Sequence, residues 1–271
     1  MDGPSRGAWG HALAVLHEQL AKPTVDARAL ARELFAIGEA VDGTAKLRRA
    51  LSDPSRDAWP KRELARKLFG GKVSAPAMTI LEAAVSGRWV SDRDLIDALE
   101  RLGIDSVLAG AEQDGALDTV EEELFRFERL VASDTALRDA LGKRDVDGKH
   151  KADLVVRLLQ GKVSADTLWL AQRPVLHPRG RKYQAAIWRQ LRIAAERRRQ
   201  ITAIVTSAIP LEATQRERLG AALTKAYGRA VFVQAVVDRN VLGGIHVRVG
   251  DEVVDGTILR RLEDARRAMG T

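Results

Sequence analysis

Two copies of a short glycine-lysine motif are the residues of this chain that most suggest phosphate chemistry. Gly71-Lys72-Val73-Ser74 recurs as Gly161-Lys162-Val163-Ser164. A phosphate-binding loop of this kind follows a strand and places Ser or Thr directly after the lysine, so that backbone N–H groups and the hydroxyl surround the phosphate. Here valine stands at that position, and each motif follows a helical pattern. We therefore interpret both copies as the boundary of a duplicated helix–turn–helix and not as nucleotide sites.

The other candidates for chemistry are isolated histidines and aspartates. His11 and His17 are six residues apart, which is off the i,i+4 spacing that puts two metal ligands on one helix face. Asp238, Asp251 and Asp255 flank turns, where aspartate is favoured for its backbone hydrogen bonds. No Ser-His-Asp set or pair of carboxylates stands at catalytic spacing, and the chain has no cysteine. The sequence thus predicts a protein without catalytic residues, cofactor or metal.

Helical periodicity dominates the first 200 residues. Apolar residues recur every three or four positions in two stretches, namely Ala27, Leu30, Leu34, Ile37, Val41 and Val120, Leu124, Phe127, Val131. Asp118 is expected to cap the second helix, because a carboxylate at that point accepts hydrogen bonds from free N–H groups. A last helix is expected over residues 184–199.

The helical region contains an internal duplication with a constant offset of 90 residues. Aligning residues 47–81 with 137–171 gives 13 identical positions out of 35, where unrelated segments would share about two or three. We expect Leu64 and Leu154 to occupy equivalent buried helix positions, and likewise Leu68 and Leu158. The helical region is therefore divided into two related units, residues 1–110 and 111–200.

The last 70 residues change to the period of strands. We expect a strand at 200–208, a helix at 212–227, strands at 230–237, 244–249 and 252–254, and a final helix from Gly256. The predicted fold class is mainly α, with two related N-terminal helical-bundle units followed by a small α+β C-terminal domain at 201–271.

Charge is distributed unevenly along the 271 residues. Residues 1–135 hold 18 Lys and Arg against 23 Asp and Glu, and residues 136–271 hold 26 against 14. These balances of −5 and +12 give the net charge of +7. A basic half is compatible with a nucleic-acid-binding adaptor or with arginines on solvated helix faces. We find no signal peptide and no apolar run near the roughly 20 residues that cross a bilayer.

The segment from Val237 to Gly256 carries an ordered set of apolar, acidic, glycine and basic positions. These are Val237, Asp238, Val241, Gly243, Gly244, Ile245, Val247, Arg248 and Gly250. Upstream, Val-Thr-Ser-Ala at 205–208 follows the basic end of the last long helix. This pattern resembles the delta subunit of F-type ATP synthases, the family known in mitochondria as the oligomycin-sensitivity-conferring protein. Residues 197–269 fit the family's spacing without a gap.

The resemblance implies a non-catalytic stator subunit of a proton-translocating ATP synthase. Its implied partners are the alpha and beta subunits of the catalytic head and the b subunit of the peripheral stalk, with no nucleic acid. The implied location is the cytoplasmic face of the cell membrane, reached only through partners. The family normally has one helical bundle, so we expect residues 111–200 to be the family-like unit and the first unit to be added. The alternative is a basic nucleic-acid-binding adaptor, which the low aromatic content of 4% disfavours for single strands.

Overall fold

The computed structural model describes residues 4–143, 145–199, 201–227, 231–238, 241, 244–249 and 252–255. The chain divides into two compact units, Met1–Arg198 and Arg199–Thr271. The first unit is helical and the second combines a sheet with a helix, so the expected mainly α fold with a small α+β C-terminal part is confirmed. Among the described helices, none is both long and apolar enough to cross a bilayer.

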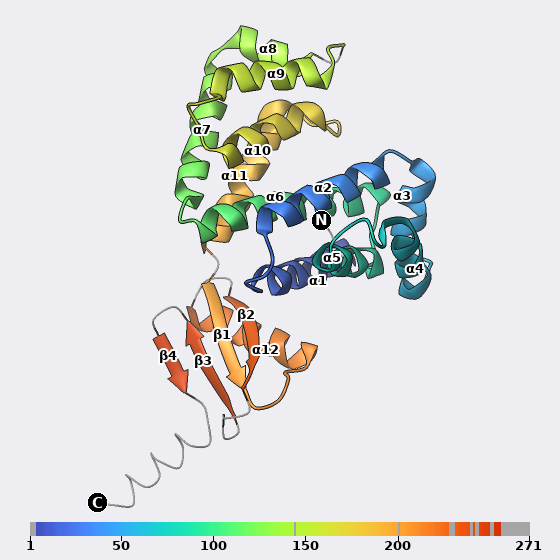
Figure 1. Ribbon diagram of the computed structural model, residues 1–271, viewed down its shortest axis with the longest axis vertical. Coiled ribbons are helices and arrows are strands. Elements are labelled where there is room, and N and C mark those ends of the chain that lie inside the picture. Colours follow the sequence, from blue (N-terminus) through green and yellow to red (C-terminus); the bar gives the residue numbers. More distant parts are fainter. Residues whose placement is uncertain are drawn as a thin grey trace, which may run out of the picture. The chain divides into compact units, whose positions relative to one another are not determined.

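The helices of the first unit follow one another with short connections (Figure 1). They are α1 Pro4–Leu20, α2 Ala27–Asp42, α3 Ala45–Ser52, α4 Ala58–Phe69, α5 Ala75–Ser86, α6 Asp92–Gln113, α7 Leu117–Ser133, α8 Thr135–Gly142, α9 Gly148–Leu159, α10 Ala165–Leu176 and α11 Tyr183–Arg199. Helices α2 to α5 begin at residues 27, 45, 58 and 75, and helices α7 to α10 begin at 117, 135, 148 and 165. Each of the four starts is thus displaced by the same 90 residues as the sequence repeat.

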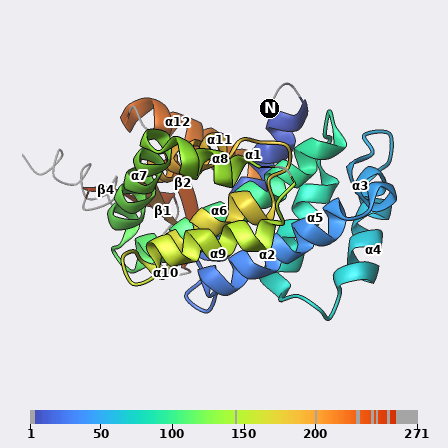
Figure 2. The ribbon, with the colours of Figure 1, turned by 90° about the horizontal axis from the view of Figure 1, so that it is seen from above.

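Apolar side chains of this unit form two clusters that share α2 and α6. The first cluster joins α1 to α6 and includes Leu34 of α2 and Leu99 of α6. The second joins α7 to α11 with the opposite sides of the shared helices, including Phe35 and Val107. Helix α6 is buried almost all round, as expected for a helix between two cores. Figures 1 and 2 show α7 at one end of this unit and α3 and α4 at the other.

Helix α6 also runs continuously through the expected boundary between residues 110 and 111. The two expected units therefore consist of repeated helices that share α6. The division at 110 stays a prediction.

The expected cap at Asp118 is wrong, because α7 begins one residue earlier, at Leu117. Gly115 adopts a φ of 68° at the end of α6, and Ala116 N–H donates to Ala111 C=O at 2.7 Å. This tight turn closes α6 through glycine and starts α7 directly, so Asp118 lies inside the first helical turn. Its carboxylate still faces the positive end of the helix dipole.

The repeated leucines do occupy equivalent helices, but they are less buried than expected. Leu64 and Leu154 lie on α4 and α9, and both are half-buried against their respective clusters. Leu68 and Leu158 are half-buried in the same way. The fully buried positions are the neighbouring ones, such as Ala65 and Val155. Because α4 and α9 lie on the surface of the unit, the apolar stripe is rotated by about one residue from the sequence estimate.

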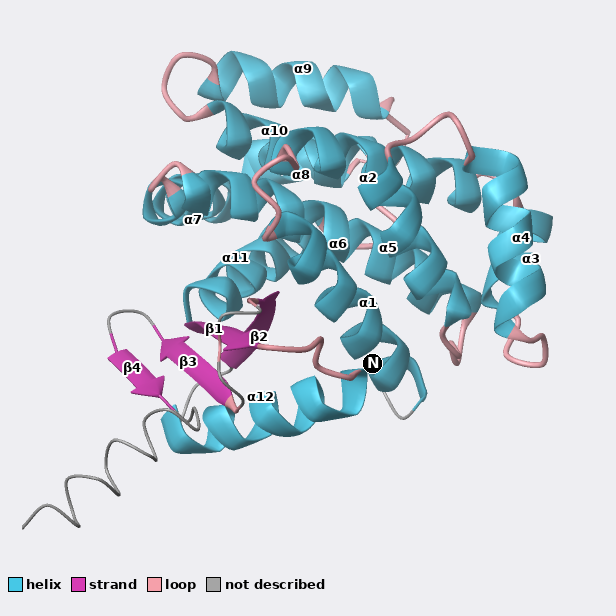
Figure 3. Ribbon diagram, turned by 60° about the horizontal axis from the view of Figure 1, so that its bottom comes forward, coloured by secondary structure: helices cyan, strands magenta, loops and turns pink. Residues whose placement is uncertain are grey.

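The second unit is a four-stranded sheet with one described helix. Its elements are β1 Ile201–Ser207, α12 Ala213–Tyr227, β2 Val231–Val237, β3 Ile245–Val249 and β4 Glu252–Asp255. The strand order is β2-β1-β3-β4, with β1 parallel to β2 and antiparallel to β3. Figure 3 shows α12 beside the sheet, where Leu219 and Leu223 pack against Ala203 and Val205 of the central strand. The helix expected from Gly256 lies outside the described residues.

Candidate interaction surfaces

The duplicated glycine-lysine motif forms the same turn in both copies. Gly71 and Gly161 adopt φ values of 72° and 75° between two helices. Ser74 caps α5 and its N–H donates to Glu33 Oε1 at 2.9 Å. Ser164 caps α10 and donates to Glu123 Oε2 at 3.0 Å. The interpretation as a duplicated helix–turn–helix boundary is confirmed.

His17 takes part in a buried electrostatic cluster. Its Nε2 lies 3.4 Å from Asp105 Oδ2, and Arg197 Nη1 donates to Asp105 Oδ1 at 2.7 Å. Burial raises the pKa of the Asp105 carboxyl, but the hydrogen bond from His17 and the charge of Arg197 outweigh it and hold the pKa below its usual value. Within the described ranges, no group of three or more His, Asp or Glu side chains is placed to hold a metal ion.

Part of the signature lies where β2 gives way to β3, namely Val237, Asp238, Val241 and Gly244. Val237 pairs with Ser207 in the last register position of β1 and β2, and Asp238 N–H donates to Ser207 C=O at 2.9 Å. Val241 N–H then donates to Asp238 C=O at 3.1 Å. Gly244 has a φ of 77°, a conformation that favours glycine. These contacts turn the chain so that it can cross to the other side of β1.

The remaining signature residues that the structure describes belong to β3. Ile245 pairs with Ser207 and is half-buried, Val247 is buried in the sheet core, and Arg248 is exposed on the opposite face. Gly243 and Gly250 lie outside the described residues, as does Asp251. The described part of the signature therefore lies in backbone turns and strand pairing, without a cluster of reactive side chains.

A line of charged pairs joins the two repeats inside the helical unit. At one end, Arg28 of α2 donates from Nε and Nη2 to the two carboxylate oxygens of Asp166 on α10, at 2.8 and 2.7 Å. At the other end of the same two helices, Arg173 Nη1 donates to Glu39 Oε1 at 2.7 Å. Such bidentate and buried arginine pairs fix the register of the two surfaces that they join.

Phe35 occupies the centre of this contact. Its ring meets the ring of Trp169 edge to face, with centroids 5.5 Å apart. The guanidinium carbon of Arg173 lies 3.8 Å from the centroid of the same ring. Phe35 is only 3% exposed. An aromatic anchor flanked by two ion pairs thus holds α10 on α2.

Helix α6 makes a second set of pairs with the arginines around α11. Glu100 Oε2 accepts from Arg181 Nη1 at 2.7 Å and from Arg189 Nη1 at 2.6 Å. Arg179, in the turn before α11, donates from Nη1 to Ile96 C=O at 2.8 Å. Its φ of 47° is unusual for a residue with a side chain, and it aims the buried guanidinium into the first repeat.

These contacts give the charge asymmetry of the sequence a structural role. Most of the pairs join a carboxylate from residues 1–135 to an arginine from 136–271, as in Glu39–Arg173, Glu100–Arg189 and Asp105–Arg197. Part of the basic excess of the second half is therefore neutralised within the chain. The sequence revealed the asymmetry, but it did not show that the two halves face each other.

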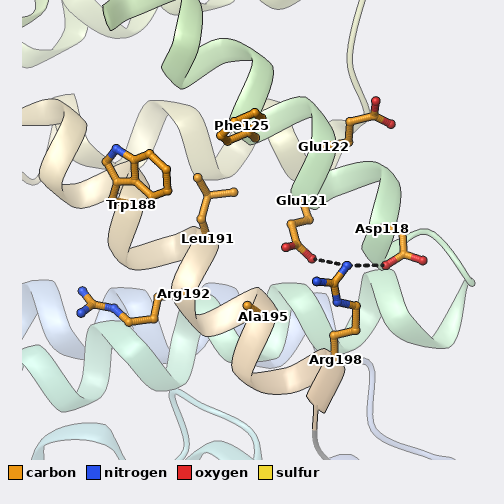
Figure 4. A pocket seen from close by; sticks show the side chains of 9 residues that line it. All are labelled: Asp118, Glu121, Glu122, Phe125, Trp188, Leu191, Arg192, Ala195 and Arg198. Carbon is orange, nitrogen blue, oxygen red and sulfur yellow. Dashed lines mark ion pairs between the residues drawn. The ribbon is translucent and has the colours of Figure 1, made fainter.

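A groove lies between α7 and α11, with a volume of about 670 Å³. In Figure 4, Phe125, Trp188 and Leu191 gather at one end, and Arg198 faces Glu121 and Asp118 at the other. Phe125 and Trp188 are 44% and 48% exposed, although their rings touch edge to face. This surface was missed at the sequence level. The pair of identical triplets Glu33-Leu34-Phe35 and Glu123-Leu124-Phe125 is the sequence signal that could have revealed it.

Comparison with known proteins places the chain in a family. The family described as ATP synthase delta (OSCP) subunit matches residues 105–269, which is more than half of the chain. The chain belongs to the ATP synthase delta (OSCP) family. Among similar proteins, ATP synthase subunit delta of Streptomyces avermitilis is 45% identical over 269 residues, covering 99% of this chain and 98% of the relative. The protein of the same name from Kineococcus radiotolerans is 42% identical over 267 residues, covering 98% and 97%.

The extent of these matches separates the two repeats of this delta family member. The family match begins at residue 105, inside α6, and so includes α7 to α11 and the sheet unit but not α1 to α5. This agrees with the expectation that the second repeat is the family-like one. The Streptomyces coelicolor protein, also named ATP synthase subunit delta, aligns over 100% of this chain and 99% of its own length at 43% identity. The added helices are therefore shared with these delta relatives.

Proposed function

We propose that this chain is the non-catalytic stator subunit of a proton-translocating ATP synthase. It connects the alpha and beta subunits of the catalytic head to the b subunit of the peripheral stalk and resists the torque of the rotor. The observation that carries the proposal is the family match over residues 105–269, together with nearly full-length similarity to proteins named ATP synthase subunit delta. ATP synthesis itself takes place on the other subunits.

The described contacts suit a subunit that transmits force. A stator element needs surfaces that do not slide when a load is applied. The pairs Arg28–Asp166 and Arg173–Glu39, with Phe35 between them, oppose sliding of α10 along α2. The two arginines on Glu100 tie α6 to the region of α11 in the same way. Such a network favours stiffness within the helical unit.

The proposed division of labour follows the domains at 1–110, 111–200 and 201–271. The helical part binds the head, and the C-terminal domain binds the end of the stalk. Val237, Asp238, Val241, Gly243, Gly244, Ile245, Val247, Arg248 and Gly250 act structurally, by forming the fold of that domain. The protein is peripheral, on the cytoplasmic face of the cell membrane, and reaches the membrane through its partners.

The test is affinity purification of the tagged full chain from its own membranes. Recovery of alpha, beta and b subunits is the expected result. Recovery of nucleic acid alone, with binding that weakens steeply as salt rises, would instead support the basic adaptor.

Fragments test the division of labour. Residues 1–200 should retain affinity for the head, and residues 201–271 should be required for the stalk. If the b subunit bound residues 1–200 as tightly as the full chain, this division would be wrong.

A further inference from the structure

The duplication gives the helical unit two equivalent helix faces. Helix α2 and helix α7 begin 90 residues apart, and each carries the triplet Glu-Leu-Phe at the same position. Phe35 and Phe125 are therefore equivalent residues. In each repeat the Glu of the triplet accepts a hydrogen bond from the serine that caps a following helix, at 2.9 and 3.0 Å. The local backbone and its capping contacts are therefore similar around Phe35 and Phe125.

In the first copy, the occupant of this face is known. Helix α10 lies along this face. Its Asp166, Trp169 and Arg173 contact Arg28, Phe35 and Glu39, respectively. The contacts follow the same order along both helices, so α10 runs in the same general direction as α2. This occupant is an amphipathic helix with a bulky aromatic residue between two charged residues of opposite sign.

In the second copy, the same face is open in the described part of the helical unit. Phe125 is 44% exposed, against 3% for Phe35. Trp188 of α11 touches its edge, with ring centroids 6.1 Å apart, but remains 48% exposed itself. The groove of about 670 Å³ runs along this face.

The competing explanation is that α7 merely caps the repeat with a polar surface, as terminal repeats do. Two substitutions agree with capping, since Ala31 and Ala36 of α2 are replaced by Glu121 and Arg126 on α7. A capping surface would, however, also replace the aromatic anchor. Here the phenylalanine is retained and a second exposed aromatic residue, Trp188, is added next to it. Adjacent exposed aromatic side chains in a groove are typical of a binding surface.

We propose that the groove between α7 and α11 is the docking site for an amphipathic helix of a partner protein. The charges of the two copies define the chemistry of that helix. Arg28 is replaced by Asp118, and Glu39 is replaced by Arg129. Both replacements lie at exposed positions of α7.

The partner helix therefore has the reverse polarity of α10. It carries a basic residue where α10 has Asp166, a bulky apolar residue where α10 has Trp169, and an acidic residue where α10 has Arg173. Arg198 Nη1 lies 3.8 Å from Asp118 Oδ1 and 3.5 Å from Glu121 Oε2. Because these separations are long, both carboxylates can accept a second cation. Shared pairing of this kind occurs in the first copy, where Arg28 pairs with both Asp114 and Asp166. The inference rests on the duplicated geometry and does not depend on the stator assignment.

The test uses the full chain and two labelled peptides, each held helical by a staple on the outward face. Both copy residues 164–177, and one carries the substitutions Asp166→Lys and Arg173→Glu. In fluorescence anisotropy, the substituted peptide should bind about tenfold tighter than the unsubstituted one, because two attractive pairs replace two repulsive ones. The double variant Asp118→Lys/Arg129→Glu should reverse this preference.

Matched variants locate the binding on the groove. Phe125→Ala should abolish binding of the substituted peptide. Trp59→Ala removes an aromatic side chain that is 64% exposed on α4 and should leave binding unchanged. Equal binding of both peptides, failure of the double variant to reverse the preference, or full binding to Phe125→Ala would overturn the proposal.

Two further outcomes would replace the partner protein by another occupant and so also overturn it. One is self-association of the full chain in sedimentation that Phe125→Ala removes, which would assign the groove to a second copy. The other is peptide binding that appears only after residues 256–271 are deleted, which would assign the groove to the chain's own C-terminal segment.

Discussion

Replacing Gly103 by alanine tests how closely α2 and α6 approach each other. A Cβ atom at this position would lie 2.5 Å from Phe35 Cε1, 2.6 Å from Cδ1 and 3.0 Å from Cζ. Ordinary carbon contacts are about 3.5–4.0 Å, so the ring would have to move by about 1 Å. Trp169 and Arg173 confine the ring on its other sides.

Two effects of opposite sign determine the magnitude. Overpacking of a confined core position costs about 1–3 kcal/mol. Replacing glycine by alanine inside a helix contributes about 1 kcal/mol of stability. Because three ring atoms lie within 3.0 Å and the ring has no free side, we expect the upper part of the overpacking range. The net loss in the free energy of unfolding should be about 1–2 kcal/mol, which lowers the melting temperature of a unit of this size by about 2–8 °C.

Thermal and urea unfolding followed by circular dichroism at 222 nm measure this loss, since most of the described helices belong to the first unit. Gly10→Ala is the matched control, because Gly10 is an exposed helical glycine on α1 whose added Cβ would meet nothing within 4 Å. That variant should gain up to about 1 kcal/mol. In a Phe35→Leu background, Gly103→Ala should cause a smaller loss in the free energy of unfolding, as expected for two residues in contact. If Gly103→Ala stabilised the protein as much as Gly10→Ala, the described contact between α2 and α6 would be incorrect.

Gly244→Val should lower the free energy of unfolding of the C-terminal unit by at least about 1–2 kcal/mol, since a β-branched residue resists the φ of 77° found there. Unchanged thermal unfolding together with unchanged stalk binding would contradict this. Leu64→Ala and Leu154→Ala should each cost about 2 kcal/mol in urea unfolding, at the low end for leucine because both side chains are half-buried. If only one of these two variants lost stability, the two leucines would not be equivalent. Because folding lowers the pKa of Asp105, its ionised carboxylate stabilises the folded state fully above the pKa of the unfolded chain, about 3.9. This stabilisation is lost as pH falls through the lower pKa of the folded state. Asp105→Asn should therefore flatten the acid side of the stability profile measured by urea unfolding at a series of pH values, and an unchanged profile would contradict this role of Asp105.

Local sequence patterns determined most of the secondary structure of this protein. The periodicity of Leu30, Leu34, Ile37 and Val41 defined α2, and all four residues are buried. Glycine and serine in the duplicated motif marked the turns before α5 and α10, because a positive φ and a side-chain cap are requirements of the local backbone. The expected strands at 200–208, 230–237, 244–249 and 252–254 correspond to β1 to β4 within one or two residues at each end. These features depend on neighbours within a few residues, which the sequence displays.

The tertiary structure decided which of two locally identical segments is buried. Glu33-Leu34-Phe35 and Glu123-Leu124-Phe125 have the same letters on equivalent helices, yet Phe35 is 3% exposed and Phe125 is 44% exposed. The difference arises because α10 covers the first face, through residues 134 to 138 positions along the chain from their partners on α2, while no described helix of the unit covers the second. The pairing of the acidic first half with arginines of the second half has the same origin. Burial and ion pairing depend on distant segments that meet only in the folded chain, so neither could be derived from local sequence alone.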